Sequence, residues 1–402
     1  MEIEFIDSQK PAKIKVVGIG GAGNNAINNM IASGLAGVGF VAANTDLQDL
    51  ENSNAPVKLQ LGAERTKGLG CGANPEIGRE AAEEDTDKIQ EVLSDCDMIF
   101  ITAGMGGGTG TGGAPVVAKA LKELDPSPLV VGVVTKPFGF EGPRRMRQAE
   151  AGIECLKEHA DTIITIPNNR LLAMAPRSSN IQNTFKLADD ILLHAVKGIS
   201  DLILLPGLIN LDFKDVWAVM SKKGQALMGT GVASGPDRAT VAAQAAISNP
   251  LLEDISHEGA QGILINITGA QEDLTLDEVN DASTMIQKEA DPEAEVIIGV
   301  AWDNSLNEEL RITVIATGIG EKGKKLPVNP DETTQVASLD EVARKQEYFD
   351  LPTRERTGPR NLNEYEPPQY SAKYGNGNKY ENFKFHEEED LETPTFMRRK
   401  GS

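Results

Sequence analysis

Seven glycines lie within the stretch Ala103-Gly104-Met105-Gly106-Gly107-Gly108-Thr109-Gly110-Thr111-Gly112-Gly113. The strand-like run 98–101 precedes it, and the helix-like run 116–118 follows it. Glycines let successive backbone N–H groups converge on one anion, and Pro115 suits the first turn of a helix whose N-terminal dipole favours negative charge. The alternative, a flexible linker, is disfavoured because linkers have polar flanks. The stretch therefore predicts a phosphate-binding loop between a strand and a helix.

A second glycine motif, Gly18-Ile19-Gly20-Gly21-Ala22-Gly23, follows a strand-like run and satisfies GxGxxG. Asn44-Thr45-Asp46 ends the next strand-like run, where a dinucleotide enzyme places the acid that binds ribose. Alone, these features suggest a nicotinamide oxidoreductase. A Rossmann site uses one glycine loop, however, whereas two loops on neighbouring strand ends suit a triphosphate. No segment matches the P-loop pattern GxxxxGK[ST], so the chain does not use that motif.

Short apolar runs alternate with amphipathic stretches over residues 13–183, which predicts an α/β domain with a doubly wound parallel sheet. The expected strands are 14–19, 38–43, 98–102, 129–135 and 162–166. A central helix is expected over 184–206, with an apolar stripe wide enough to be buried between two domains. Residues 207–320 predict a smaller α+β domain, with strands at 262–267, 294–301 and 310–317 and a helix at 239–248.

Both ends of the chain are expected to differ from these domains. Residues 1–12 are expected to form a flexible N-terminus. Residues 321–389 are rich in Lys, Glu, Asn, Pro and Tyr with few aliphatic side chains, which predicts a disordered linker. A capping-box pattern at 338–341 is able to start a short helix through Tyr348, and the sequence leaves open whether that helix forms. Residues 390–402 combine an acidic start with an apolar and basic motif.

The composition limits the possible partners. A formal net charge of −21 argues against nucleic-acid binding, which requires a basic face. No apolar run approaches the ~18 residues of a membrane span, and the N-terminal residues have no secretory-signal pattern, so we expect a cytoplasmic protein. The three cysteines lack a CxxC pair and the four histidines lack zinc-ligand spacing, which predicts free thiols and no protein-held metal cluster.

Six motifs occur in an order that resembles the FtsZ family, the bacterial tubulin homologues of cell division. They are Gly20-Gly21-Ala22-Gly23-Asn24-Asn25, Asn44-Thr45-Asp46, Gly70-Cys71-Gly72-Ala73-Asn74-Pro75, the glycine loop 104–112, Phe138-Gly139-Phe140-Glu141-Gly142-Pro143-Arg144-Arg145 and Asn210-Leu211-Asp212-Phe213-Lys214-Asp215. The resemblance covers about 13–320 and the terminal peptide. It implies a tubulin-like, Rossmann-like GTPase domain, a central helix and a smaller α+β domain. Ala22 stands where many relatives have glycine.

The resemblance implies a site for GTP or GDP. The residues implied to contact the phosphates are Gly21, Ala22, Gly23, Asn24, Asn25, Gly108, Thr109 and Gly110. Glu141 would bind the ribose, Arg145 would lie beside the nucleotide, and Mg²⁺ would offset the phosphate charge. Asp189 would accept hydrogen bonds from guanine N1 and N2, which selects GTP over ATP. From spacing alone, Glu141 and Arg145 would be a helix-surface ion pair. The sequence leaves open whether Asp189 or Asp190 faces the base.

Asp212 and Asp215 have two interpretations. By pattern alone, Asp212 is a helix N-cap and Asp215 an acid in the first turn. The resemblance implies instead that both acids enter the GTP site of the next subunit, position the attacking water and so make hydrolysis depend on head-to-tail polymerisation. A nucleotide-regulated scaffold that polymerises without hydrolysis is a further alternative, against which the presence of both acids argues.

The resemblance also implies a cellular role. The chain would form the ring at the midcell division site, recruit other division proteins and turn over by GTP hydrolysis. Asp390 to Lys400 would dock membrane tethers such as FtsA. The apolar contacts would come from Leu391, Pro394, Phe396 and Met397, and the charge from Arg398, Arg399 and Lys400. Contact with the membrane would therefore be indirect.

Overall fold

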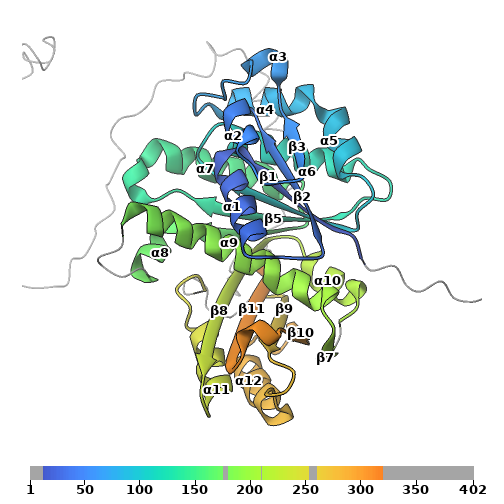
Figure 1. Ribbon diagram of the computed structural model, residues 1–402, viewed down its shortest axis with the longest axis vertical. Helices are drawn as coiled ribbons and strands as arrows, with labels where there is room; N and C mark the ends of the chain where they lie inside the picture. The colour runs from blue at the N-terminus through green and yellow to red at the C-terminus, as the bar shows by residue number, and fades with distance from the viewer. Residues whose placement is uncertain (1–11, 175–179, 210, 253–259, 320–402) are drawn as a thin grey trace, which may run out of the picture. The chain divides into compact units, whose positions relative to one another are not determined.

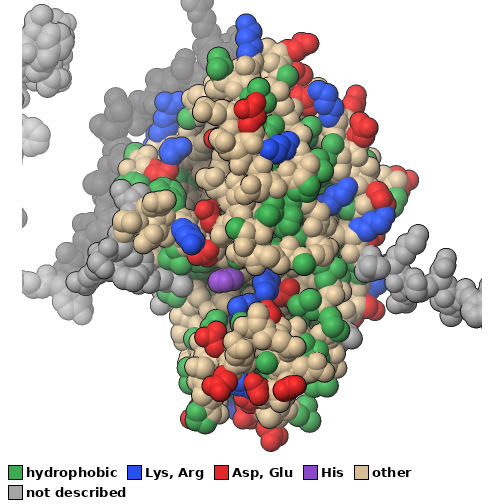
Figure 2. All heavy atoms as spheres, viewed as in Figure 1, with side chains coloured by type: hydrophobic (Ala, Val, Ile, Leu, Met, Phe, Trp, Pro, Cys, Tyr) green, Lys and Arg blue, Asp and Glu red, His purple; other side chains and the backbone are tan. Residues whose placement is uncertain are grey.

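The computed structural model describes residues 12–174, 180–209, 211–252 and 260–319 (Figure 1). The expectations for the N-terminal segment before residue 12, the linker 321–389, the helix at 338–348 and the terminal peptide 390–402 lie outside the described residues. No helix in the described ranges is both long and apolar enough to cross a membrane. In the face seen in Figure 2, basic side chains are scattered among acidic ones, and acidic side chains gather at the end where α11 and α12 lie.

The first part of the chain forms the predicted parallel sheet, in the order β3-β2-β1-β4-β5-β6. Its strands are β1 (Ile14–Ile19), β2 (Val38–Asn44), β3 (Val57–Gln60), β4 (Met98–Gly104), β5 (Leu129–Lys136) and β6 (Thr162–Pro167). This is the strand order of a Rossmann fold, whose ligand site lies where the order reverses, between β1 and β4. Ile19 pairs with Ala103, so the carboxyl ends of those two strands, and the glycine loops that follow, lie side by side.

Helices cover both faces of this sheet (Figure 1). The helices of this part of the chain are α1 (Gly20–Ala32), α2 (Leu47–Glu51), α3 (Ala63–Thr66), α4 (Pro75–Glu84), α5 (Thr86–Leu93), α6 (Thr109–Lys122), α7 (Pro143–Lys157) and α8 (Asn168–Met174). Alternate residues of β1 divide between two cores, because successive side chains of a strand point to opposite faces. Val16 packs with α1 and α9, whereas Val17 packs with α5, α6 and α7.

The central helix is α9 (Ile181–Leu204), which starts three residues before the expected position. Asn180 caps it by accepting a hydrogen bond from the backbone N–H of Asn183 at 2.7 Å. Its apolar stripe belongs to one core that also contains Val131 of β5 and Leu264 of β9. The helix is therefore buried against both halves of the sheet.

The second half of the sheet is mixed. Its elements are β7 (Gly207–Ile209), α10 (Phe213–Met220), β8 (Gln225–Ser234), α11 (Arg238–Ile247), β9 (Gly262–Gly269), α12 (Leu276–Glu289), β10 (Glu295–Trp302) and β11 (Glu309–Ile319). The order continues β6-β8-β11-β9-β10-β7, which gives eleven strands within the described residues. β8 joins the two halves through two parallel pairs only, Ile163 with Gln225 and Ile164 with Ala226. α11 and α12 cover the face opposite α9 and α10.

Candidate nucleotide site

Two uncapped helix N-termini meet at the reversal of strand order. α1 follows β1 directly, and α6 begins at Thr109 within the glycine loop after β4. Neither N-cap residue, Ile19 or Gly108, makes a side-chain cap, and neither helix has an acid in its first turn. The neighbouring α2 and α4 are capped by the side chains of Asp46 and Asn74. The first N–H groups and positive dipole ends of α1 and α6 are thus available to an anion.

Glycines allow the close packing that brings these helix ends together. A Cβ at Gly18 would lie 2.4 Å from the carbonyl oxygen of Gly23, and a Cβ at Gly23 would lie 2.5 Å from that of Thr102. Gly106 has a φ of 98°, a left-handed conformation that L-residues with side chains rarely adopt. The two glycine motifs therefore serve packing and turns as well as presenting N–H groups.

A cavity of about 390 Å³ opens at these helix ends. This is within the ~300–1,000 Å³ of typical small-molecule sites. Nine of the eleven residues assigned to the nucleotide line it, namely Gly21, Ala22, Asn25, Gly108, Thr109, Gly110, Glu141, Arg145 and Asp189. Gly23 and Asn24 do not line it. Gly23 packs against β1 and β4, and Asn24 is 3% exposed with no partner for either polar side-chain atom among the described residues.

Glu141 and Arg145 form an ion pair at the cavity wall. Glu141 ends a short 3-10 helix, 139–141, and Arg145 lies in the first turn of α7, so the pair joins two elements and is not a pair within one helix. Glu141 also accepts a hydrogen bond from the backbone N–H of Phe138 at 2.8 Å. The side chain of Arg145 is 46% exposed and that of Glu141 is 14% exposed, so the guanidinium is the more accessible of the two groups.

The structure distinguishes the two adjacent acids of α9. Asp190 accepts a hydrogen bond from Nδ2 of Asn29 at 2.9 Å, whereas Asp189 lines the cavity. Burial, with a smaller contribution from the charge of Asp190, raises the pKa of Asp189 to about 7. A ligand that donates hydrogen bonds to Asp189 would favour its carboxylate form.

Two further residues line the cavity that sequence patterns did not indicate. Asn168, the first residue of α8, is 5% exposed, and its Oδ1 has no partner among the described residues. Phe185 of α9 lies edge-on to Phe138, with ring centroids 5.2 Å apart, and remains 42% exposed. A planar ring with N–H donors fits beside this aromatic face and the free Asn168 oxygen. An isolated Asn and an isolated Phe carry no motif, so only the fold could reveal them.

Asp212 and Asp215 lie outside this cavity. Both are exposed and form a reciprocal capping box at the start of α10. The N–H of Asp215 donates to Oδ1 of Asp212 at 2.9 Å, and the N–H of Asp212 donates to Oδ2 of Asp215 at 3.2 Å. Within one chain, their observed contacts are those of a helix cap.

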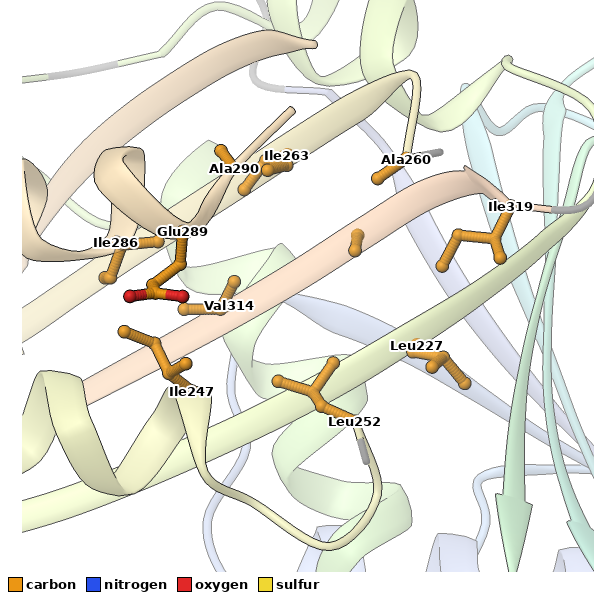
Figure 3. A pocket seen from close by; sticks show the side chains of 11 residues that line it. Leu227, Ile247, Leu252, Ala260, Ile263, Ile286, Glu289, Ala290, Val314 and Ile319 are labelled. Atoms are coloured by element: carbon orange, nitrogen blue, oxygen red, sulfur yellow. The ribbon is translucent and has the colours of Figure 1, made fainter. Parts of the chain in front are cut away.

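Other features do not compete with this site. Asp46, the acid of the dinucleotide alternative, caps α2 and does not line the cavity. A separate cavity of about 40 Å³ between α11, α12 and the sheet is apolar except for Glu289 (Figure 3). Within the described part of the chain, no group of three or more His, Cys, Asp or Glu side chains is placed to hold a metal ion.

Comparisons with known proteins agree with the fold. Residues 13–176 match the model of the Tubulin/FtsZ family, GTPase domain, and residues 224–320 match that of the FtsZ family, C-terminal domain. The chain is 53% identical over 328 residues to a cell division protein FtsZ of Wolbachia sp, covering 79% of this chain and 82% of that protein. It is 45% identical over 402 residues to the cell division protein FtsZ of Pseudomonas aeruginosa, covering 99% of each.

Solved structures show the same similarity. A structure described as an empty FtsZ dimer from M. jannaschii superimposes with a TM-score of 0.73 at 45% identity, covering 77% of this chain and 89% of that one. CetZ1 from Haloferax volcanii, described as a GDP-bound monomer, superimposes with a TM-score of 0.68 at 24% identity, which shows a common fold. The sequence identity over most of both chains shows that this chain belongs to the FtsZ family and carries its GTPase domain.

Proposed function

We propose that this protein binds GTP in the cavity between α1, α6 and α9 and hydrolyses it when a second copy completes the site. The observation that carries the proposal is the convergence of two uncapped helix N-termini on one end of a cavity whose wall presents Asp189. The helix ends suit a polyphosphate, and the acid suits a base with two adjacent N–H donors. Membership of the FtsZ family supports the same ligand.

Guanine is favoured over adenine by the chemistry of Asp189. A carboxylate accepts hydrogen bonds from guanine N1 and N2, whereas adenine N1 is an acceptor and would face the carboxylate oxygen unfavourably. Phe185 would pack against the base, and Glu141 would hold the ribose beside Arg145. Gly21, Ala22 and Asn25 would contact the phosphates from α1, and Gly108, Thr109 and Gly110 would contact them from α6.

Hydrolysis would require head-to-tail assembly. Asp212 and Asp215 are exposed and outside their own chain's cavity, which is the arrangement needed if they serve the site of a neighbouring subunit. There they would orient the attacking water, and phosphoryl transfer depends mainly on such positioning and on electrostatic stabilisation. Mg²⁺ would arrive with the nucleotide, bind mainly phosphate oxygens and water, and offset their charge.

The cellular proposal rests on the family. Filaments of this protein would form the cytokinetic ring on the cytoplasmic side of the division site, recruit other division proteins and turn over as GTP is hydrolysed. Residues 390–400 would bind tethers such as FtsA and so hold the filaments near the membrane. Those residues lie outside the described ranges, so the sequence motif and the family resemblance support this part.

Adjacent acids provide a matched test of the nucleotide site. We expect Asp189→Ala to weaken GTP binding by about tenfold to a hundredfold, because two hydrogen bonds to a charged group are lost. Asp190→Ala should change it by less than about threefold, since it loses a bond to Asn29 and the smaller contribution to the pKa of Asp189. Equilibrium binding of GTP and ATP to both variants measures this. Equal losses in the two variants, or ATP binding as strong as GTP binding in the unsubstituted protein, would contradict the proposed base contact.

A further inference from the structure

The apolar cavity in the second half of the sheet is separate from the nucleotide site. It lies between β8, β9 and β11 on one side and α11 and α12 on the other (Figure 3). Leu227, Ile263 and Ile286 are among its aliphatic walls. Among the described residues, Glu289 is the one charged residue that lines it.

The size and polarity of this cavity limit what it is able to bind. A single water needs ~10–15 Å³ of such volume and a benzene ring ~150 Å³, so about 40 Å³ suits one aliphatic side chain. Glu289 is the last residue of α12, is exposed, and forms no ion pair with another described residue. The occupant that fits is therefore an aliphatic side chain next to a Lys or an Arg.

β11 ends at this cavity. Its last residue, Ile319, lines the cavity together with Ala316. In a regular strand these two side chains would point to opposite faces. The register of β11 against β8 shifts between them, and Gly318 has a φ of 73°, so both face the cavity. The chain that follows Ile319 therefore starts at the cavity wall.

The sequence after β11 contains an aliphatic residue next to two cations. The segment 320–328 reads Gly-Glu-Lys-Gly-Lys-Lys-Leu-Pro-Val, so Leu326 is its first aliphatic residue and follows Lys324 and Lys325. Seven extended residues span about 25 Å, which is ample to cross a cavity of this volume. Pro327 restricts Leu326 to extended conformations, which lowers the entropy that binding costs.

The aliphatic residue of the terminal peptide is less suited to this cavity. Leu391 is flanked by Asp390 and Glu392, whose charges oppose that of Glu289. It also lies about ten times as many residues from β11 as Leu326 does. For a flexible chain, that separation lowers the effective concentration at the cavity by about thirtyfold.

We propose that Leu326 binds in the apolar cavity, with Lys324 or Lys325 beside Glu289, and so holds the start of the linker against α11 and α12. These helices cover the face opposite α9 and α10, so the linker leaves the molecule from their face. In a tethered filament, this exit sets the face from which residues 390–400 reach the tether. That consequence rests on the proposed function, whereas the binding of Leu326 does not.

Disulfide trapping in the full-length chain without nucleotide tests the occupant. Ala290 lines the cavity, so Ala290→Cys is combined with Leu326→Cys, which keeps a small apolar side chain, or with Val336→Cys as the matched control. Peptide mass spectrometry identifies these pairs among the native thiols.

The ratio of the two closure rates is decisive. A chain that leaves β11 freely would close the pair with residue 326 about fourfold faster than the pair with residue 336, because it is the shorter loop. Burial of the side chain at 326 should raise this ratio to about twentyfold or more. A ratio near fourfold would overturn the proposal.

Charge reversal at the cavity separates specific binding from chance contact. Glu289→Lys repels the two lysines and should lower the ratio toward fourfold. Both pairs share the thiol at position 290, so any change in its reactivity cancels in the ratio. Glu272→Lys, before the start of α12, is the matched control and should leave the ratio unchanged. Equal effects of the two reversals would contradict the ion pair and overturn the proposal.

Other occupants give distinct results in the same experiment. Faster closure of Ala290→Cys with Leu391→Cys than with Leu326→Cys would assign the cavity to the terminal peptide. A disulfide between two chains would assign it to a second copy, and either result would overturn the proposal. The measurement needs no nucleotide, so failure of GTP binding would refute the proposed function and leave this inference standing.

Discussion

At the scale of single residues, Asp189 of the central helix has the clearest consequence for nucleotide binding. Burial first, and the Asp190 charge second, raise the pKa of Asp189 to about 7, so near neutral pH about half of the unliganded molecules carry a protonated Asp189. Guanine binding requires the carboxylate form as an acceptor. The proton must leave before the base is bound, so acid should oppose binding.

The expected pH dependence follows from that pKa. Between pH 7 and pH 6, GTP affinity should fall by about fivefold, because the ionised fraction of a group with pKa near 7 falls by that factor. Asp189→Asn should lack this dependence and thereby corrects for titration of the GTP phosphates themselves. Equilibrium binding at pH 6, 7 and 8 measures both proteins. A parallel pH profile in the two proteins would remove Asp189 from base recognition.

The same acid affects stability without nucleotide. A carboxyl whose folded pKa lies above its unfolded value binds more protons when folded, so it lowers the free energy of unfolding as pH rises from about 4 to about 7. Asp189→Asn should therefore gain stability relative to the unsubstituted protein over that range, with a constant difference above it. Urea unfolding of both nucleotide-free proteins at pH 5 and pH 8 checks the sign. A difference that shrinks with rising pH would contradict the assigned pKa shift.

Residues that belong to motifs could be assigned to one common site from the sequence. The glycine loops and Asp189 were placed by ordered patterns and family resemblance, and they line one cavity. Asn168 and Phe185 were missed because one side chain of each type carries no periodicity or spacing. Gly23 and Asn24 show a different limit, since a helix start presents some residues to the cavity and turns others into the core. The strand register decides which of these residues face the cavity and which face the core, and the sequence does not give the register.

At the scale of elements, the N-terminus of α10 combines two roles that one substitution would confuse. Asp212→Ala removes both the helix cap and the carboxylate, whereas Asp212→Ser keeps a capping hydroxyl and removes the charge. We expect Asp212→Ala to lose about 1 kcal/mol of unfolding free energy and Asp212→Ser to lose only a few tenths. Both should lose GTP turnover strongly while GTP binding by the isolated chain stays near normal. Full turnover in Asp212→Ser would leave Asp212 with a capping role only.

The strands that could be predicted from the sequence are those with nearly unbroken apolar runs. Strands such as Met98–Gly104 are apolar except for Thr102 because both faces are covered, and their positions could be predicted from the sequence. β8 was missed because Gly229 and Gly231 interrupt its pattern. A Cβ at those glycines would lie 2.2 Å from the carbonyl oxygen of Ala246 and 2.0 Å from that of Ala242, so they exist to let α11 pack on the strand. The packing of α11 imposes this requirement, and the pattern of the strand's own residues does not indicate it.

At the scale of the whole molecule, we expect tethering by the terminal peptide to be independent of filament formation. Removing residues 390–402 should leave GTP turnover and polymerisation unchanged, because the cavity and α10 lie within 12–319. It should abolish binding to vesicles that carry a membrane tether such as FtsA. Light scattering and vesicle co-sedimentation measure the two properties. Loss of polymerisation in the truncated protein would show that the peptide contributes to assembly.

We expect the active site to be shared, so that one chain holds the nucleotide and the next chain supplies Asp212 and Asp215. The most direct measurement is phosphate release per molecule from GTP and from ATP, with Mg²⁺ present, across a range of protein concentrations. We expect release from GTP but not ATP, with a rate per molecule that is negligible below a threshold concentration and rises steeply above it. A rate per molecule that is independent of concentration would mean a self-contained active site and would rule out a site shared between subunits.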